Sequence, residues 1–197
     1  IVPSGNDQLL VGDNIYIASE KSHVTRALSV FGHEEEEARN VVIVGGGNVG
    51  TFISEQLTES NNKFQIKIIE RDEKRAFKVA EKLSKAVVLH GDALDMEILK
   101  EANIHGTESI ISVTNDDKVN ILSALLAKQM GCKSAITLIN DHSFGDLTDS
   151  VGIEAFVDPR QTTVSSILKH MRRGRISSLQ SLAGGEAEIM EAVAVEA

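Results

Sequence analysis

Short apolar runs alternate with longer amphipathic stretches through most of the chain. The runs are rich in Val and Ile, and the first contains no polar residue at all, which is typical of strands buried on both faces of a parallel sheet. This pattern predicts strands at residues 41–44, 64–69, 86–90, 109–113, 134–139 and 155–157. Between the strands, apolar residues recur with helical spacing. Helices are therefore predicted at residues 51–59, 72–83, 95–102, 119–130 and 160–173.

A regular alternation of strands and helices favours one fold class. Parallel strands joined by right-handed helical crossovers form a doubly wound α/β sheet, and the expected strand order is 3-2-1-4-5-6. We therefore predict a Rossmann-like domain. Its ligand crevice should lie across the carboxyl ends of the first and fourth strands, where the winding direction reverses.

The first strand runs directly into a glycine-rich turn. Gly45, Gly47 and Gly50 have the G-x-G-x-x-G spacing of a dinucleotide-binding loop. In such loops the first glycine allows the turn, the second admits a pyrophosphate, and the third lets helix pack on strand. The following helix would offer free backbone N–H groups to the phosphates. A Rossmann-like unit that binds no nucleotide would show the same spacing, so the motif needs support from elsewhere.

That support comes from the ends of the other strands. Glu70 ends the second strand twenty residues after Gly50, where a carboxylate can accept hydrogen bonds from ribose hydroxyls. Asp92 follows the third strand, and the polar segment 114–117 follows the fourth. Because the carboxyl ends of parallel strands meet at one edge, these groups should converge on one nucleotide site.

The flanks of this unit are organised differently. Residues 1–32 carry a predicted short strand at 15–18 and a helix at 22–31, too little to bury a core, so they should complete a preceding domain. Residues 33–39 include the acidic run 34–37, interpreted as a solvated linker or, alternatively, as a recognition tail. Residues 176–197 should begin another β-containing domain. The chain therefore has the character of an excised fragment.

The helix after the sixth strand carries a basic group. Arg160 opens it, and three arginines lie at its end. These side chains form either a solvated face or contacts with phosphate or with an acidic partner. The apolar stripe of the same helix consists of Val164, Ile167, Leu168 and Met171.

Composition and charge exclude several classes of protein. The 197-residue chain has a net charge of −9, which disfavours nucleic acid as a partner because phosphates would be repelled. Its single cysteine, Cys132, excludes an internal disulfide and suits a reducing cytoplasm. No apolar run approaches the length of a membrane span, and no signal peptide is evident.

Several of these segments together resemble the TrkA family of Trk-type potassium-uptake regulators, which are built from RCK (KTN) domains. The resemblance rests on residues 40–50, 69–72, 90–93 and 114–120, and on residues 2–17, which resemble the end of a TrkA-C domain. It implies a tail of a first TrkA-C domain at 1–32, a linker at 33–39, a second RCK domain at 40–158, a crossover helix at 159–175 and the start of a second TrkA-C domain at 176–197.

The resemblance also implies a function and a set of binding residues. The family regulator is cytoplasmic, peripheral at the inner face of the membrane, and gates a potassium-transporting membrane subunit of the TrkH or TrkG type. It self-associates through RCK domains and binds NAD or NADH, or else ATP or ADP. The implied contacts are Gly45, Gly47, Asn48, Val49 and Gly50 at the pyrophosphate, Glu70 at the ribose with Arg71 toward phosphate, Asp92 and Ala93 at the adenine, and Thr114 and Asp116 at the distal half.

An enzyme remains the alternative, as the cofactor domain of an NAD-dependent oxidoreductase or epimerase. Such chemistry needs a proton donor or acceptor near the nicotinamide. The only tyrosine, Tyr16, precedes the Rossmann unit, and His90, His105 and His142 are scattered without a partner pattern. Only 39 residues follow Asp158, too few for a substrate domain within this sequence. No catalytic residue and no metal site is predicted.

Overall fold

The computed structural model of the chain describes residues 5–10, 15, 17, 19–20, 23–32, 38–60, 63–144, 153, 155–171, 176–182 and 187–192. The chain divides into two compact units, residues 1–37 and residues 38–197.

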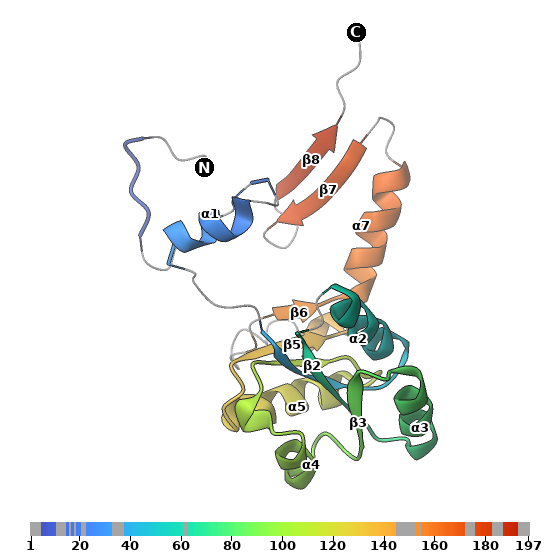
Figure 1. Cartoon of the computed structure of the whole chain (residues 1–197). Helices are drawn as coiled ribbons and strands as arrows, with labels where there is room; N and C mark the ends of the chain where they lie inside the picture. The colour runs from blue at the N-terminus through green and yellow to red at the C-terminus, as the bar shows by residue number, and fades with distance from the viewer. Residues whose placement is uncertain are drawn as a thin grey trace. The chain divides into compact units, whose positions relative to one another are not determined.

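A six-stranded parallel sheet forms the centre of the larger unit (Figure 1). Its strand order is β3-β2-β1-β4-β5-β6, and every neighbouring pair is parallel. The predicted doubly wound fold and its strand order are thus confirmed. The strands are β1 (Asn40–Val44), β2 (Gln65–Glu70), β3 (Ala86–His90), β4 (Ser109–Ser112), β5 (Ser134–Leu138) and β6 (Ala155–Val157).

Helices cover both faces of this sheet. They are α2 (Asn48–Ser60), α3 (Glu73–Lys82), α4 (Met96–Glu101) and α5 (Asp117–Gln129). The 3-10 turns are η2 (Ile104–Gly106) and η3 (His142–Phe144), and the helix α7 (Pro159–Met171) follows β6. One apolar layer joins the sheet to α2 and α3, and the other joins it to α4 and α5. Within β1, Val41 and Ile43 enter the first layer, while Val42 and Val44 enter the second. This two-sided burial explains why β1 is continuously apolar.

Aspartates set the starts of three helices. Asp72, Asp95 and Asp116 are the N-cap residues of α3, α4 and α5, and each side chain accepts a hydrogen bond from a backbone N–H of the first turn. These caps fix where the helices leave the carboxyl edge of the sheet. The helix α5 therefore begins at Asp117, two residues before the predicted start.

The helix α2 also starts earlier than predicted, at Asn48 instead of Thr51. The backbone N–H of Thr51 donates to Gly47 O over 3.0 Å, so the second glycine already belongs to the first helical turn. The glycine loop is consequently short, and α2 begins directly after Gly47.

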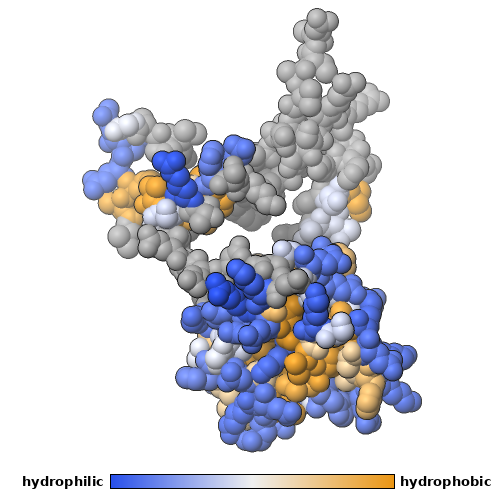
Figure 2. All heavy atoms as spheres, in the orientation of Figure 1, coloured by the Kyte–Doolittle hydropathy of each residue, from blue (hydrophilic) through white to orange (hydrophobic). Residues whose placement is uncertain are grey.

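The smaller unit contains α1 (Val24–Val30). The apolar side chains of Val24, Leu28 and Phe31 are each exposed by about two fifths, and hydrophobic surface is visible over this helix (Figure 2). The predicted strand at 15–18 is not formed at Ile15 or Ile17, and its other two residues lie outside the described part of the chain.

The antiparallel strands β7 (Ile176–Leu182) and β8 (Ala187–Ala192) form a hairpin in the segment expected to begin another β-containing domain. The arginines at 172, 173 and 175 fall outside the described residues. None of the described helices is both long enough and apolar enough to cross a membrane.

Candidate functional site

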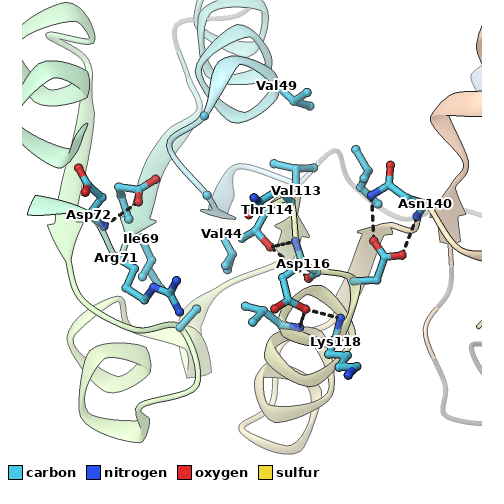
Figure 3. Close-up of a pocket in the computed structure, with 18 of the residues that line it drawn as sticks. Val44, Val49, Ile69, Arg71, Asp72, Val113, Thr114, Asp116, Lys118 and Asn140 are labelled. Carbon is cyan, nitrogen blue, oxygen red and sulfur yellow. Dashed lines mark hydrogen bonds between the residues drawn. The ribbon is translucent and has the colours of Figure 1, made fainter. Parts of the chain in front are cut away.

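A cleft of about 1350 Å³ opens across the carboxyl ends of the parallel strands (Figure 3). The glycine loop lines one wall and the segment after β4 lines the other, as the topology predicts. Ten of the eleven residues predicted as binding contacts line this cleft. They are Gly45, Gly47, Asn48, Val49, Glu70, Arg71, Asp92, Ala93, Thr114 and Asp116. The structure therefore brings these separate segments together, while Gly50 lies outside the lining.

Packing explains the position of Gly50. A Cβ atom added there would lie 2.0 Å from the carbonyl oxygen of Gly45, so only glycine lets α2 approach the turn. Gly45 itself has φ of +105°, a conformation that side chains disfavour. These two glycines are required by the fold of the loop.

Gly47 differs from the other two glycines of the motif. A Cβ atom added at Gly47 would meet no atom within 4 Å, and the backbone φ is not positive. Nothing in the described protein therefore requires a glycine here. The residue faces the open cleft, where a close-fitting ligand would supply the reason.

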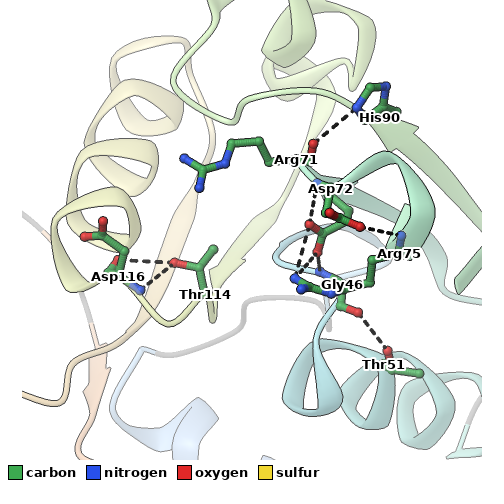
Figure 4. Close-up of polar contacts among 9 residues, drawn as sticks. Gly46, Thr51, Arg71, Asp72, Arg75, His90, Thr114 and Asp116 are labelled. Atoms are coloured by element: carbon green, nitrogen blue, oxygen red, sulfur yellow. Dashed lines mark hydrogen bonds and ion pairs between the residues drawn. The ribbon is translucent and has the colours of Figure 1, made fainter. Parts of the chain in front are cut away.

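Glu70 is more deeply engaged in the protein than the sequence suggests. Its side chain is 5% exposed, Oε2 accepts a hydrogen bond from the Gly46 N–H, and Oε1 accepts one from the Asp72 N–H, each 2.8 Å long. Arg75 Nη1 lies 3.4 Å from both oxygens (Figure 4). The carboxylate thus ties the glycine loop to the start of α3. Because a carboxylate has about four lone-pair sites, acceptor capacity remains for a ligand hydroxyl.

The neighbouring Arg71 is placed differently. Its side chain is exposed and extends into the cleft in both close-up views (Figures 3 and 4). Asp92, after β3, is exposed and accepts a hydrogen bond from the Leu94 N–H over 2.9 Å. Ala93 is only 4% exposed and its side chain belongs to the apolar core. At Ala93 the backbone, more than the methyl group, can face a ligand.

On the opposite wall, a buried amide holds the loop after β4. Asn120 is fully buried, and its Oδ1 accepts hydrogen bonds from both the N–H and the hydroxyl of Thr114, at 2.8 and 2.6 Å. Its Nδ2 donates to Thr114 O and to Leu138 O, at 3.0 and 2.9 Å. Asn120 therefore positions Thr114 at the cleft and links it to the end of β5.

The two aspartates after Thr114 divide their roles. Asp116 caps α5, accepting from the backbone N–H groups of residues 118 and 119. Asp117 accepts from the side chain and backbone of Asn140 and from the Asp141 N–H. Of these two adjacent acids, Asp116 is therefore the helix cap. Its carboxylate is nevertheless exposed at the cleft.

Sequence reasoning did not single out several other residues of the cleft. They are Arg75, Lys118, Asn140 and Phe144, and Arg160 was named only as a possible phosphate contact. Arg75 could have been found from helix periodicity, because it lies one turn into the helix that follows Glu70. Asn140 and Phe144 follow β5 without a recognisable motif. The described lining contains six acidic and four basic side chains, so the cleft carries charges of both signs.

The histidines and the cysteine contribute no reactive cluster in the described residues. His90 and His105 lie within hydrogen-bonding distance of backbone carbonyls, at 3.2 and 3.3 Å. Cys132 is buried, and its thiol donates to Ser134 O. No group of three or more His, Cys, Asp or Glu side chains with metal-binding geometry occurs in this described part.

Residues 41–159 match the TrkA-N domain family. The chain is 45% identical to a Trk system potassium uptake protein TrkA of Azorhizobium caulinodans, over 97% of this chain and 42% of that protein. It is 39% identical to the TrkA of Halomonas elongata, over 98% of this chain and 42% of the relative. The chain thus spans about two fifths of the curated relatives that it matches.

Solved structures show the same fold. The TrkA-N domain of the Escherichia coli inner membrane protein YbaL superposes with a TM-score of 0.62 at 16% identity, covering 70% of this chain and all of that domain. The GsuK channel bound to NAD gives a TM-score of 0.58 at 16% identity, covering 81% of this chain and 29% of the channel chain. At these identities the likeness concerns the fold alone.

Proposed function

The chain belongs to the TrkA-N domain family, and from this membership and the cleft we propose that it is the nucleotide-sensing part of a regulatory subunit for potassium uptake. In this role it binds NAD or NADH, or else ATP or ADP, and adjusts the activity of a potassium-transporting membrane subunit of the TrkH or TrkG type. The intact protein would be cytoplasmic, peripheral at the inner face of the membrane, and self-associated through its RCK domains. The proposal includes no catalysis.

The geometry at Gly47 is the observation that carries the proposal. Open space lies in front of this glycine, and the backbone N–H groups of the first turn of α2 begin beside it. This combination suits a diphosphate, because the N-terminus of a helix attracts anions and no side chain stands in the way. Glu70 and Arg71 would then meet the ribose and phosphate, and Thr114 and Asp116 the distal half of the ligand.

Relatives support the same assignment. The protein from Azorhizobium caulinodans is named as a Trk potassium uptake protein, and the GsuK channel was solved with NAD. We propose that residues 40–158 are the RCK domain and 159–175 its crossover helix. Residues 1–32, joined to the RCK domain by the linker at 33–39, and residues 176–197, which follow the crossover helix, would be pieces of two TrkA-C domains.

Ligand-induced stabilisation tests the proposal. A ligand that binds only the folded form at 100 times its dissociation constant adds about 2.7 kcal/mol to stability. We expect NADH, NAD, ATP or ADP to raise the melting temperature in a saturable manner. NADPH should be weaker, since Glu70 disfavours a 2′-phosphate. The variant Gly47→Asp should melt at the unliganded temperature of the parent and gain nothing from any of these nucleotides.

A separate measurement addresses catalysis. The chain is incubated with NADH and candidate carbonyl substrates, and oxidation of NADH is monitored by the decrease of nicotinamide absorbance. We expect no saturable oxidation. Saturable turnover would replace the regulatory assignment with the oxidoreductase alternative. Absence of stabilisation by all five nucleotides would remove the nucleotide-sensing assignment itself.

A further inference from the structure

A second depression lies beside the glycine loop, between α2 and α3, and we call it the α2–α3 groove. Its volume is about 420 Å³, which is within the range of small-ligand sites. Its lining comes from the loop, one side of α2 and one side of α3. The lining residues are Gly46, Gly47, Asn48, Thr51, Phe52, Glu55, Arg75, Lys78, Val79 and Lys82.

The charge of the groove is opposite to that of the whole chain. Arg75, Lys78 and Lys82 follow one another at helical spacing along α3, and Glu55 is the only acid in the lining. Lys82 Nζ pairs with Glu55 over 2.8 Å, while Lys78 forms no ion pair with another described residue. On a chain of net charge −9, such a basic strip marks a place for an anion.

The groove also offers an apolar surface. Phe52 is 61% exposed on α2, and the buried Val79 of α3 belongs to the same lining. An exposed aromatic ring beside cationic groups suits a ligand that combines a phosphate with a flat ring. Phosphate oxygens match the guanidinium fork of Arg75 and the ammonium of Lys78.

Arg75 belongs to both depressions. It lines the cleft and the groove, its side chain is 54% exposed, and its 3.4 Å contacts with Glu70 are long for a charge-assisted hydrogen bond. Figure 4 shows Arg71 extending away from Arg75, toward Thr114 and Asp116 on the opposite wall of the cleft. An anion in the groove would therefore compete with Glu70 for this guanidinium.

From this arrangement we propose that the α2–α3 groove binds a phosphate-bearing small molecule with a flat ring, and that Arg75 couples this site to the cleft. When the anion draws Arg75 away, Glu70 keeps its two backbone donors but loses its cationic partner. The carboxylate then accepts a ribose hydroxyl more strongly, so occupancy of the groove raises nucleotide affinity. By reciprocity the nucleotide raises the affinity of the groove for its anion. The coupling, but not the groove site, rests on the proposed function.

Binding to the groove is tested without nucleotide. Inorganic phosphate is titrated at constant ionic strength against chloride while backbone amide NMR shifts are followed. We expect saturable shifts at Gly46, Thr51 and Lys78. They should be lost in Lys78→Ala and kept in Lys74→Ala, which removes an exposed lysine of the same helix outside the groove.

Ring recognition is tested with phenyl phosphate. Contact with Phe52 should make this probe bind about fivefold more tightly than phosphate, the equivalent of an aromatic pair. The variant Phe52→Leu should remove that advantage. Shifts that do not saturate, or that are equal in both lysine variants, would show an adventitious ion only and overturn the site. Saturable shifts confined to Val49 and Thr114 would place phosphate in the cleft and overturn it as well.

Coupling is tested by calorimetry with NADH, with and without phosphate at equal ionic strength. We expect about a fivefold gain in NADH affinity in the parent and none in Lys78→Ala. An unchanged or reduced affinity in the parent overturns the coupling. Absence of NADH binding, with the groove shifts intact, contradicts the proposed function but leaves the groove site standing.

Discussion

Both ends of β1 are held by a glutamate that accepts two backbone hydrogen bonds, yet only one end forms a site. At the amino end, Oε2 of Glu108 accepts from the N–H groups of Arg39 and Asn40, at 2.6 and 2.9 Å. At the carboxyl end, Glu70 accepts one bond on each oxygen, from residues 46 and 72.

The difference lies in what the two carboxylates join. The Glu108 side chain is 27% exposed, bonds to adjacent residues of one strand end, and has Lys133 at 3.9 Å. Glu70 is buried and joins the glycine loop to the start of α3, with Arg75 beside it. The same chemistry thus fixes a strand end in one place and the walls of a cleft in the other. The loops diverge at the carboxyl ends of the strands, where the winding direction reverses, so the cleft forms at that end of β1.

The largest loss of stability is expected from Gly50→Ala, beyond the carboxyl end of β1. The new Cβ atom would lie 2.0 Å from Gly45 O, so α2 and the loop must separate. We expect a loss of about 3 kcal/mol in the free energy of unfolding, the upper range for overpacking. Urea denaturation measures it. A loss below about 0.5 kcal/mol, the ordinary effect of a surface substitution, would show that the loop is not packed as described.

Glu70→Gln and Glu108→Gln compare the two ends directly. A glutamine at 70 must turn its NH₂ group toward one of the two N–H donors, leaving a buried donor unsatisfied at about 2 kcal/mol. A glutamine at 108 can keep both bonds on its single carbonyl oxygen and should be nearly silent. Thermal and urea unfolding of both variants check this order. Equal losses would mean that the division of bonds between the oxygens does not matter.

Gly47→Ala should separate stability from binding. No atom lies near the added methyl group, so the free energy of unfolding should change little. The methyl group would stand where the diphosphate approaches, and nucleotide affinity should fall about tenfold, or about 1.4 kcal/mol. Calorimetry and urea denaturation of the same sample show whether only binding changes. A variant that loses stability but keeps its affinity would place the ligand elsewhere.

The smallest expected effect is on the pH dependence of stability in acid. Hydrogen bonds from the Asn40 and Arg39 N–H groups lower the pKa of Glu108 below its usual value near 4.5. Because the folded pKa is the lower one, the contribution of Glu108 to stability is present above the unfolded value. It is lost as pH falls below about 4.5 and through the folded pKa. Between pH 5 and 3, the free energy of unfolding should therefore fall slightly less in Glu108→Gln than in the parent chain. A steeper fall in the variant would contradict the assignment of this pH dependence to Glu108.

Much of this fold could be predicted from sequence because its strands are buried on both faces. Runs such as 41–44 have no polar residue and admit few other interpretations. The helix starts were less exact. Asp116 accepts two backbone N–H groups at the start of α5, and Gly47 O accepts the Thr51 N–H at the start of α2, so these helices begin two and three residues before the predicted positions. Such local hydrogen bonds depend on loop geometry, which periodicity does not contain.

The site was predictable in outline but not in its internal bonds. Spacing placed Glu70 opposite the glycine loop, yet did not reveal that both oxygens are already bonded to backbone N–H groups. Asn120 appeared as part of a motif, but its four hydrogen bonds to Thr114 and Leu138 follow from burial, which only the folded structure shows.

Calorimetric titration of NADH into the parent chain and into Gly47→Asp tests the central claim most directly. The account predicts saturable binding at one site in the parent and none in the variant, with both proteins unfolding at similar urea concentrations. Equal NADH affinity in the two proteins would contradict the claim that a diphosphate lies against the backbone of Gly47.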